Sequence, residues 1–265
     1  MSVTSEHDEL SSYDNAEAWA EGPQAVYDRL AVTALAGLPA RLDGKRAIDV
    51  GAGTGAATRD LLDRGCSVVA VDRSTSMLAE LSRQTQGRVP TLVGDIRDLP
   101  LPDDGYDVTI AAFVLNHLAD AAEGVRELAR VTRPDGQVIA TTFGADDHPM
   151  KKAIDEVLVR YGFEHPSWYL LYKRERIPLI ADVASLTSVG INGGLVDAKV
   201  EEVVVDLSDL PVEAAIGYRL GLAHIAPFVE TLDAPTRTRL YDELRETVTT
   251  LPPLWLPMLV LTGRG

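Results

Sequence analysis

Between residues 46 and 143, short runs rich in β-branched residues alternate with stretches of helical periodicity. Such alternation is typical of a parallel sheet whose strands are joined by crossover helices. The helical stretch before the fifth run is followed by Arg-Pro-Asp-Gly, which predicts a turn. The five expected strands cover residues 46–50, 67–72, 90–95, 106–112 and 136–143.

The rest of the chain surrounds this core with helices and adds two strands. Residues 14–37 predict one or two helices, with Pro23 in a first turn. Later helical stretches are expected over 146–190, 211–228 and 234–249, and further strands over 198–208 and 254–263. The predicted fold class is α/β, with a Rossmann-like, seven-stranded, mostly parallel sheet, helical cap insertions around strand six and N-terminal lid helices. The expected parts are lid helices at 1–44, a cofactor-binding core at 45–145, cap insertions with the sixth strand at 146–253, and a final core strand at 254–265.

A loop with three glycines, Gly51, Gly53 and Gly55, joins the first expected strand to the first helix of the core. Glycines there allow a backbone to approach a ligand closely. A dinucleotide fingerprint would place its third glycine three positions after the second, and here the spacing is two. No Gly-Lys-Ser/Thr follows, which excludes a P-loop. The loop alone leaves the ligand open.

Acidic residues at the ends of the first three strands narrow the choice. Asp49 stands two residues before the first glycine and would repel a pyrophosphate, so it suits a ligand with an ammonium or sulfonium group. Asp72 has the spacing of a ribose-binding acid, and Asp95 could accept from the amine of a base while Ile96 packs on its ring. Each acid alone could merely bind loop amides or cap a helix. In succession they predict one ligand crevice.

Four segments together resemble the class I S-adenosylmethionine-dependent methyltransferases, in particular the ubiquinone/menaquinone-type and small-molecule enzymes. They are "AIDVGAGTGAAT", "VVAVDRSTSML", "LVGDIRDLPLPDDGYDVTIAAFVLNHLAD" and "GVRELARVTRPDGQVIATTF". The resemblance covers about residues 45–143 and implies S-adenosyl-L-methionine as cofactor, with S-adenosyl-L-homocysteine as its product.

The resemblance also implies roles for individual residues. Asp49 would hold the amino end of the cofactor, Asp72 the ribose, and Asp95 with Ile96 the adenine. Several relatives carry serine where Ala112 stands, so a side-chain hydrogen bond is missing there. The remaining residues expected at the cofactor are Tyr13 from the lid, Gly51, Ala52, Gly53, Thr54 and Gly55 from the loop, Arg73, and Ala112 and Phe113 through their backbone.

The catalytic residue is less constrained, because the sulfonium already activates the methyl group. Proximity, orientation and exclusion of water supply much of the catalysis, and a general base is needed only for a protonated, weakly acidic nucleophile. His117, just after the fourth strand, is the candidate base. The alternative is that it packs beside the cofactor. His148, His165 and His224 lie in the insertions, where packing or surface positions are expected.

The aromatic segment "RYGFEHPSWYLLYKRER" is long enough to cover the crevice, and its rings could contact a planar acceptor. The alternatives are that these rings form the core of the insertion or a dimer contact. A homodimer is therefore left open.

Composition limits the partners. The formal net charge of −15 repels phosphate backbones, so nucleic acid is not expected. No apolar run is long enough to span a bilayer, no secretory signal is visible, and a single cysteine excludes internal disulfides. We therefore expect a cytoplasmic protein without membrane contact. Histidines and cysteines are too scattered for a metal site.

The preferred function is methyl transfer from S-adenosyl-L-methionine to a small-molecule acceptor, such as a secondary metabolite or quinone-like compound. The alternative keeps the cofactor but catalyses a non-methyl reaction such as cyclisation, or serves as a non-catalytic partner subunit. An NAD(P)-dependent oxidoreductase is disfavoured by Asp49 and by the missing Tyr-x-x-x-Lys pair.

Overall fold

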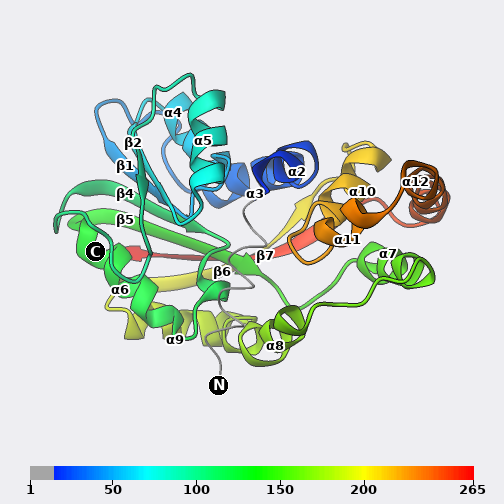
Figure 1. Cartoon of the computed structure of the whole chain (residues 1–265). Coiled ribbons are helices and arrows are strands. Elements are labelled where there is room, and N and C mark those ends of the chain that lie inside the picture. The colour runs from blue at the N-terminus through cyan, green and yellow to red at the C-terminus, as the bar shows by residue number, and fades with distance from the viewer. Residues whose placement is uncertain (1–14) are drawn as a thin grey trace.

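A seven-stranded sheet in the order β3-β2-β1-β4-β5-β7-β6 forms the centre of the molecule (Figure 1). The computed structural model describes residues 15–265, so Tyr13 lies outside the described residues. The strands are β1 (Arg46–Val50), β2 (Ser67–Asp72), β3 (Thr91–Val93), β4 (Tyr106–Ala112), β5 (Thr132–Phe143), β6 (Val196–Asp206) and β7 (Trp255–Arg264).

The first five strands pair in parallel, and β7 runs antiparallel between β5 and β6. Parallel pairing places the ends of β1, β2, β3 and β4 at the same edge of the sheet. The predicted mostly parallel, seven-stranded fold class is confirmed.

Helices cover both faces of the sheet. Helices α3 (Gln24–Ala34), α4 (Ala56–Asp63) and α5 (Thr75–Gln84) lie on one face, and α6 (Ala121–Val131) and α9 (Val183–Asn192) on the other (Figure 1). Strand residues alternate between two apolar clusters: Ala47 and Ile110 belong to one, Ile48 and Ala111 to the other. Burial on both faces explains why these strands have continuous apolar sequences.

A helical cap lies beyond one end of the sheet, formed from both sides of β6 in the sequence (Figure 1). Its main contacts join α7 to α12, α10 to α12 and α10 to α3. The N-terminal helix α2 (Ala16–Glu21) packs on α3 and α5. The cap elements are α7 (Pro149–Arg160), α8 (Ser167–Glu175), α10 (Val212–Leu220), α11 (Ala226–Thr231) and α12 (Ala234–Thr249), and two 3₁₀ turns, η1 (Leu115–His117) and η2 (Ile177–Leu179), complete the described elements.

The predicted turn at Arg-Pro-Asp-Gly is wrong. Strand β5 begins at Thr132, directly after α6, and the Pro-Asp-Gly residues form an irregularity within it. Tyr106 pairs with Thr132 but Val108 pairs with Gln137, so β5 advances by five residues where β4 advances by two. A bulge accommodates proline, which has no N–H to donate. The Arg133 side chain holds this bulge to β4 through an ion pair with Asp107 at 2.7 Å.

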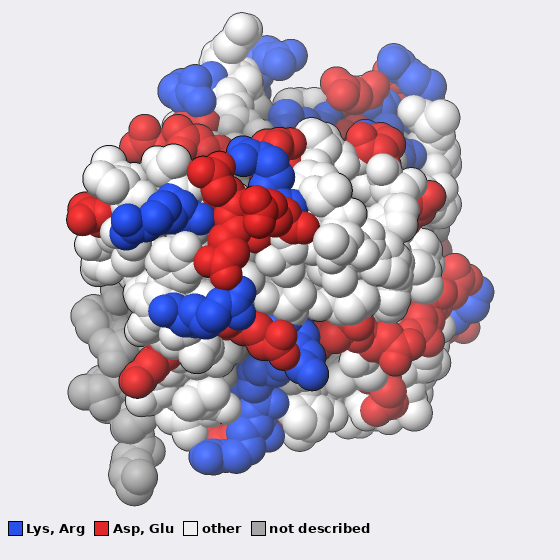
Figure 2. Space-filling model, turned by 90° about the vertical axis from the view of Figure 1, so that its right-hand side faces the viewer, with Lys and Arg blue, Asp and Glu red and all other residues white. Residues whose placement is uncertain are grey.

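Charged residues of both signs alternate on the face formed by α7 and α12 (Figure 2). Ion pairs there include Arg160 with Glu243 and Arg245 with Asp242. Within residues 15–265, no helix is long and apolar enough to cross a bilayer.

Replacing Ile110 with alanine tests the importance of the core under the central strand. Ile110 is fully buried, and we expect Ile110→Ala to lower the free energy of unfolding by about 2–5 kcal/mol. Val204 on β6 is 62% exposed, so Val204→Ala should change the free energy of unfolding by less than about 0.5 kcal/mol. Urea denaturation of both variants measures the difference, and equal effects would contradict the assigned core.

Candidate cofactor and acceptor site

The glycine loop is held in a backbone conformation that suits glycine. Gly51, Gly53 and Gly55 have φ angles of 68°, 52° and 91°. The amides of Gly51 and Ala52 donate to the carbonyl of Val71 at 2.7 and 3.0 Å, which ties the loop to β2. A Cβ on Gly51 would collide with Val114, whereas a Cβ on Gly53 would meet no atom of residues 15–265 within 4 Å. The loop therefore leaves space on the Gly53 side.

Asp49 is buried beneath this loop, only 1% exposed. The Thr58 hydroxyl, in the first turns of α4, donates to its Oδ2 at 2.6 Å. Burial raises the pKa of Asp49 to about 6, and the charge of Asp72 adds to this rise, while the hydrogen bond from Thr58 opposes it. A carboxyl in this setting gains from a nearby positive charge.

Asp72, at the end of β2, connects the loop to the next helix. Its Oδ2 accepts from the amide of Gly53 and its Oδ1 from the amide of Ser74, each at 2.8 Å. Each carboxylate oxygen has two lone pairs and can therefore accept more than one hydrogen bond. Arg73 lines the same cavity.

Two of the predicted cofactor residues do not line the cavity. The Asp95 carboxylate is bound by the guanidinium of Arg97 at 2.7 and 3.0 Å, which lowers its pKa. Ile96 does line the cavity and is buried. Gly55 caps the N-terminus of α4 instead. The contact of Asp95, Ile96 and Gly55 with a cofactor stays a prediction.

The end of β4 is held in an unusual conformation. Phe113 has a φ of 58°, which is rare for a residue with a side chain. Its amide donates to the carbonyl of Thr141 at 3.1 Å and contacts the Thr141 hydroxyl at 3.2 Å. Ala112 and Phe113 both line the cavity, and their backbone contact with a cofactor stays a prediction.

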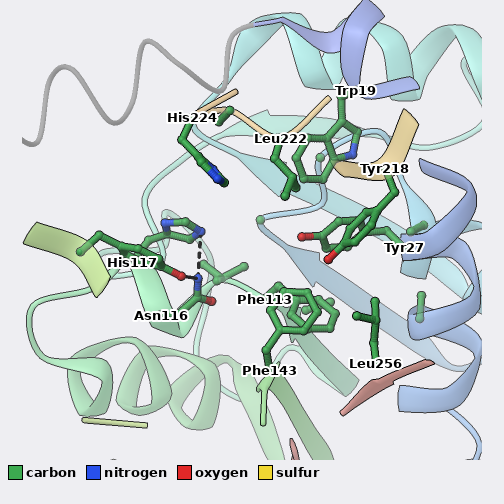
Figure 3. Close-up of a pocket in the computed structure, with 18 of the residues that line it drawn as sticks. Trp19, Tyr27, Phe113, Asn116, His117, Phe143, Tyr218, Leu222, His224 and Leu256 are labelled. Carbon is green, nitrogen blue, oxygen red and sulfur yellow. Dashed lines mark hydrogen bonds between the residues drawn. The ribbon is translucent and has the colours of Figure 1, made fainter. Parts of the chain in front are cut away.

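One cavity of about 610 Å³ extends from the glycine loop to the cap. Its middle is an aromatic belt, defined as Trp19, Tyr27, Phe113, Phe143 and Tyr218 (Figure 3). The ring centroids of Tyr27 and Phe113 are 5.2 Å apart, and those of Phe113 and Phe143 are 4.5 Å apart. The belt combines α2, α3 and α10 with the ends of β4 and β5, so it exists only in the folded chain.

Sequence reasoning assigned no role to Trp19, Tyr27 or Tyr218. The only available signal was the expected lid, since Trp19 and Tyr27 lie on the first two described helices. Of the insertion aromatics, Trp168, Tyr169 and Tyr172 line the cavity, and their contact with an acceptor stays a prediction.

His117 lies on the cavity wall after β4 (Figure 3). Its Nε2 is 3.1 Å from the amide nitrogen of Asn116, which also donates to the Tyr172 hydroxyl at 2.7 Å. Its ring stacks on that of Tyr172, with centroids 5.5 Å apart. These contacts hold the imidazole in one orientation.

His148 also lines the cavity but has a structural role. Its Nδ1 accepts from the amide of Met150 at 3.1 Å, which caps α7, and its Nε2 lies 3.1 Å from the carbonyl of Pro253. Burial lowers its pKa. His224 belongs to the cap end of the cavity. Within the described part of the chain, no group of three or more His, Cys, Asp or Glu could hold a metal ion.

The residues present fit S-adenosyl-L-methionine. The open space at Gly53 admits a ligand against the loop, and the buried Asp49 suits its cationic amino-acid part. Asp72 at the adjacent strand end supplies acceptor oxygens for hydroxyls.

Comparison with known proteins gives the same result. A family model described as methyltransferase domain matches residues 48–140. The demethylmenaquinone methyltransferase of Renibacterium salmoninarum is 30% identical over 195 residues, which cover 66% of this chain and 80% of that protein. A malonyl-[acyl-carrier protein] O-methyltransferase of Halorhodospira halophila is 40% identical over 124 residues, 45% of this chain and 42% of that protein.

The phosphoethanolamine N-methyltransferase 2 of Haemonchus contortus, solved in complex with S-adenosyl-L-methionine, shares the fold. Its TM-score is 0.55 at 17% identity, covering 89% of this chain and 51% of that chain. The chain spans between 42 and 49% of the length of several curated relatives that it matches. On the strength of the Renibacterium alignment and the matching fold, the chain belongs to the class I S-adenosylmethionine-dependent methyltransferase family.

Proposed function

We propose that this protein transfers a methyl group from S-adenosyl-L-methionine to a small-molecule acceptor. The observation that carries the proposal is the continuity of one cavity, which joins the glycine loop and the buried Asp49 to the aromatic belt. A cofactor on the loop and an acceptor in the belt would share this space, as in-line transfer requires.

Residues at the loop end would hold the cofactor. Asp49 would stabilise its cationic amino-acid part, Asp72 would accept from its ribose hydroxyls, and Ile96 would pack on its adenine. The bound cofactor supplies an electrophilic methyl group. The guanidinium of Arg97 binds the carboxylate of Asp95. Asp95 would therefore contact the adenine only while it keeps this ion pair.

The aromatic belt would bind a planar or largely apolar acceptor and exclude water around the reacting atoms. A quinone-like compound or a secondary metabolite has this shape. The names of the demethylmenaquinone methyltransferase relatives support the quinone-like class.

His117 is the proposed proton acceptor for a protonated nucleophile. While the Asn116 amide donates to its Nε2, the neutral ring carries its proton on Nδ1. A hydroxyl group of the methyl acceptor would have to displace the Asn116 amide from Nε2 before it could transfer its proton to that nitrogen.

Incubation with S-adenosyl-L-methionine and a panel of hydroquinones, phenols and carboxylic acids tests the function. We expect a methylated product and equimolar S-adenosyl-L-homocysteine by mass spectrometry. Failure to bind S-adenosyl-L-homocysteine in calorimetry would overturn the proposal. Conversion of an acceptor without formation of S-adenosyl-L-homocysteine would instead select the cyclisation alternative.

Replacing Gly53 with alanine tests the space beside the loop. The new Cβ would enter the space proposed for the cofactor, so we expect Gly53→Ala to weaken binding of S-adenosyl-L-homocysteine at least about 10-fold, together with about 1–2 kcal/mol of backbone strain. Gly87 is a matched control: its φ is 68°, a Cβ there would meet no described atom within 4 Å, and it is not part of the cavity lining. Gly87→Ala should show the same strain and unchanged affinity. Equal affinity losses in both variants would place the cofactor elsewhere.

The raised pKa of Asp49 predicts a pH dependence. Because the folded pKa of about 6 lies above the ordinary value of 3.8, protonation of Asp49 stabilises the ligand-free protein at low pH, and this contribution is lost as the pH rises through 6. A cationic ligand favours the ionised form, so its affinity should fall as the pH decreases from about 7 to 5.

Calorimetry over this pH range, in buffers of different ionisation enthalpy, measures the proton released on binding of S-adenosyl-L-methionine. Asp49→Asn should weaken binding at pH 7 by about 10- to 100-fold and flatten the pH dependence. An unchanged pH profile in this variant would exclude Asp49 as the responsible group.

Replacing His117 with glutamine separates proton transfer from packing. We expect His117→Gln to lower kcat by about 10²- to 10⁴-fold and to leave the affinity for S-adenosyl-L-homocysteine unchanged. Single-turnover kinetics with an acceptor found above measure the effect. A loss smaller than about 10-fold, with the pH profile retained, would assign His117 to packing.

A further inference from the structure

We propose that the cap end of the cavity is an anion-binding subsite, defined as Arg219, His224, Lys151 and Lys173, which holds an ionised oxygen of the acceptor. The inference rests on the proposed function and specifies its substrate class: a largely apolar small molecule that carries a carboxylate or an acidic enol or phenol.

Buried nitrogen atoms without partners mark this subsite. Arg219 is 3% exposed and His224 is 7% exposed, and both line the cavity. Among the described residues, Nε of Arg219 and Nε2 of His224 are buried and make no hydrogen bond. Buried polar groups are nearly always hydrogen-bonded, so two such atoms on one cavity wall indicate the place of a polar ligand group.

The surrounding structure holds both side chains in place. The guanidinium of Arg219 donates through one terminal nitrogen to both carboxylate oxygens of Asp155, at 2.8 and 3.0 Å. This pair leaves the Nε–H of Arg219 for another acceptor. The His224 ring stacks on Tyr169, with centroids 3.6 Å apart and an interplanar angle of 6°. Figure 3 shows His224 pointing into the cavity across from His117.

The charges around His224 favour an anion. Lys151 and Lys173 line the same end of the cavity as Arg219, and Asp146 and Asp147 are the acids of that lining. Lys151 pairs with both oxygens of Asp147 at 2.8 Å, and Asp155, behind Arg219, is outside the lining. At the cap end of the lining, the three cations thus outnumber the two acids by one, although Asp155 pairs with Arg219 from outside the lining.

His224 itself is a hydrogen-bonding group rather than a base. Burial lowers its pKa well below 6.5, and Arg219, His165, Lys151 and Lys173 lower it further. The imidazole is therefore neutral at pH 7, and its proton can stand on Nε2 and be donated to an anionic oxygen. This separates its role from that proposed for His117.

Two probe pairs test the subsite on the full chain loaded with S-adenosyl-L-homocysteine. 2-Naphthoate is compared with neutral 2-naphthamide, and the acidic enol 4-hydroxycoumarin with neutral coumarin, by calorimetry at pH 7.5. We expect at least one acid to bind about 10-fold or more tightly than its neutral partner. The pair that shows the preference identifies the anion as a carboxylate or an enolate.

Two variants locate that preference. His224→Phe retains the ring stacked on Tyr169 but removes Nε2, and Lys173→Gln removes a charge from the lining. Each should reduce the preference for the acid at least about 3-fold, with unchanged affinity for S-adenosyl-L-homocysteine. Lys152→Gln is the control, because its side chain is 85% exposed on α7 and outside the lining, and it should leave the preference intact.

Equal binding of acids and neutral partners, absence of acid binding, or a preference that survives both variants would overturn the subsite. The proposed function fails separately, through loss of S-adenosyl-L-homocysteine binding at the glycine loop. In that case the same titrations on the cofactor-free protein still measure the acid preference.

Discussion

The geometry of the site depends on two carboxylates that hold the glycine loop from below and from the side. Asp49 accepts a hydrogen bond from the Thr58 hydroxyl and so joins the end of β1 to α4. Asp72 accepts hydrogen bonds from the amides of Gly53 and Ser74. Hydrogen bonds to charged groups are stronger than neutral ones, and a buried carboxyl retains its partners because losing them is costly. These bonds fix a loop whose three glycines would otherwise allow many backbone conformations.

Around this loop, the topology decides which surfaces meet. Parallel pairing from β1 to β5 places the strand ends at one edge, and the chain segments flanking β6 build a cap beyond one end of the sheet. The aromatic belt lies between the two, with rings from α2, α3 and α10 against Phe113 and Phe143. The apolar belt suits a planar body. At the cap end, one nitrogen each of Arg219 and His224 has no partner among residues 15–265 and suits a polar group attached to that body.

Local patterns predicted the core well and failed where long-range pairing intervened. The strands of the first two βα units match their predicted bounds, because their apolar runs are bounded by glycine and charged residues. The Pro-Asp-Gly turn was wrong because pairing with β4 and the Arg133–Asp107 ion pair keep that segment within β5. Strand β3 ends at Val93, two residues before its predicted end at Asp95. The partner of Asp95, Arg97, also comes from the following loop, whose conformation has no periodic signal.

The sequence by itself determined the α/β alternation, the glycine loop and the acids at the strand ends. All three arise from residues close together in the chain, where strand and turn preferences act directly. Only the tertiary structure decided what faces the loop. Trp19, Tyr27, Tyr218, Arg219 and His224 come from helices and loops far apart in the sequence, and each looks locally like an ordinary packing residue. They line one cavity because the cap helices pack against α3 and the sheet end, and that contact depends on side-chain fit across the whole fold.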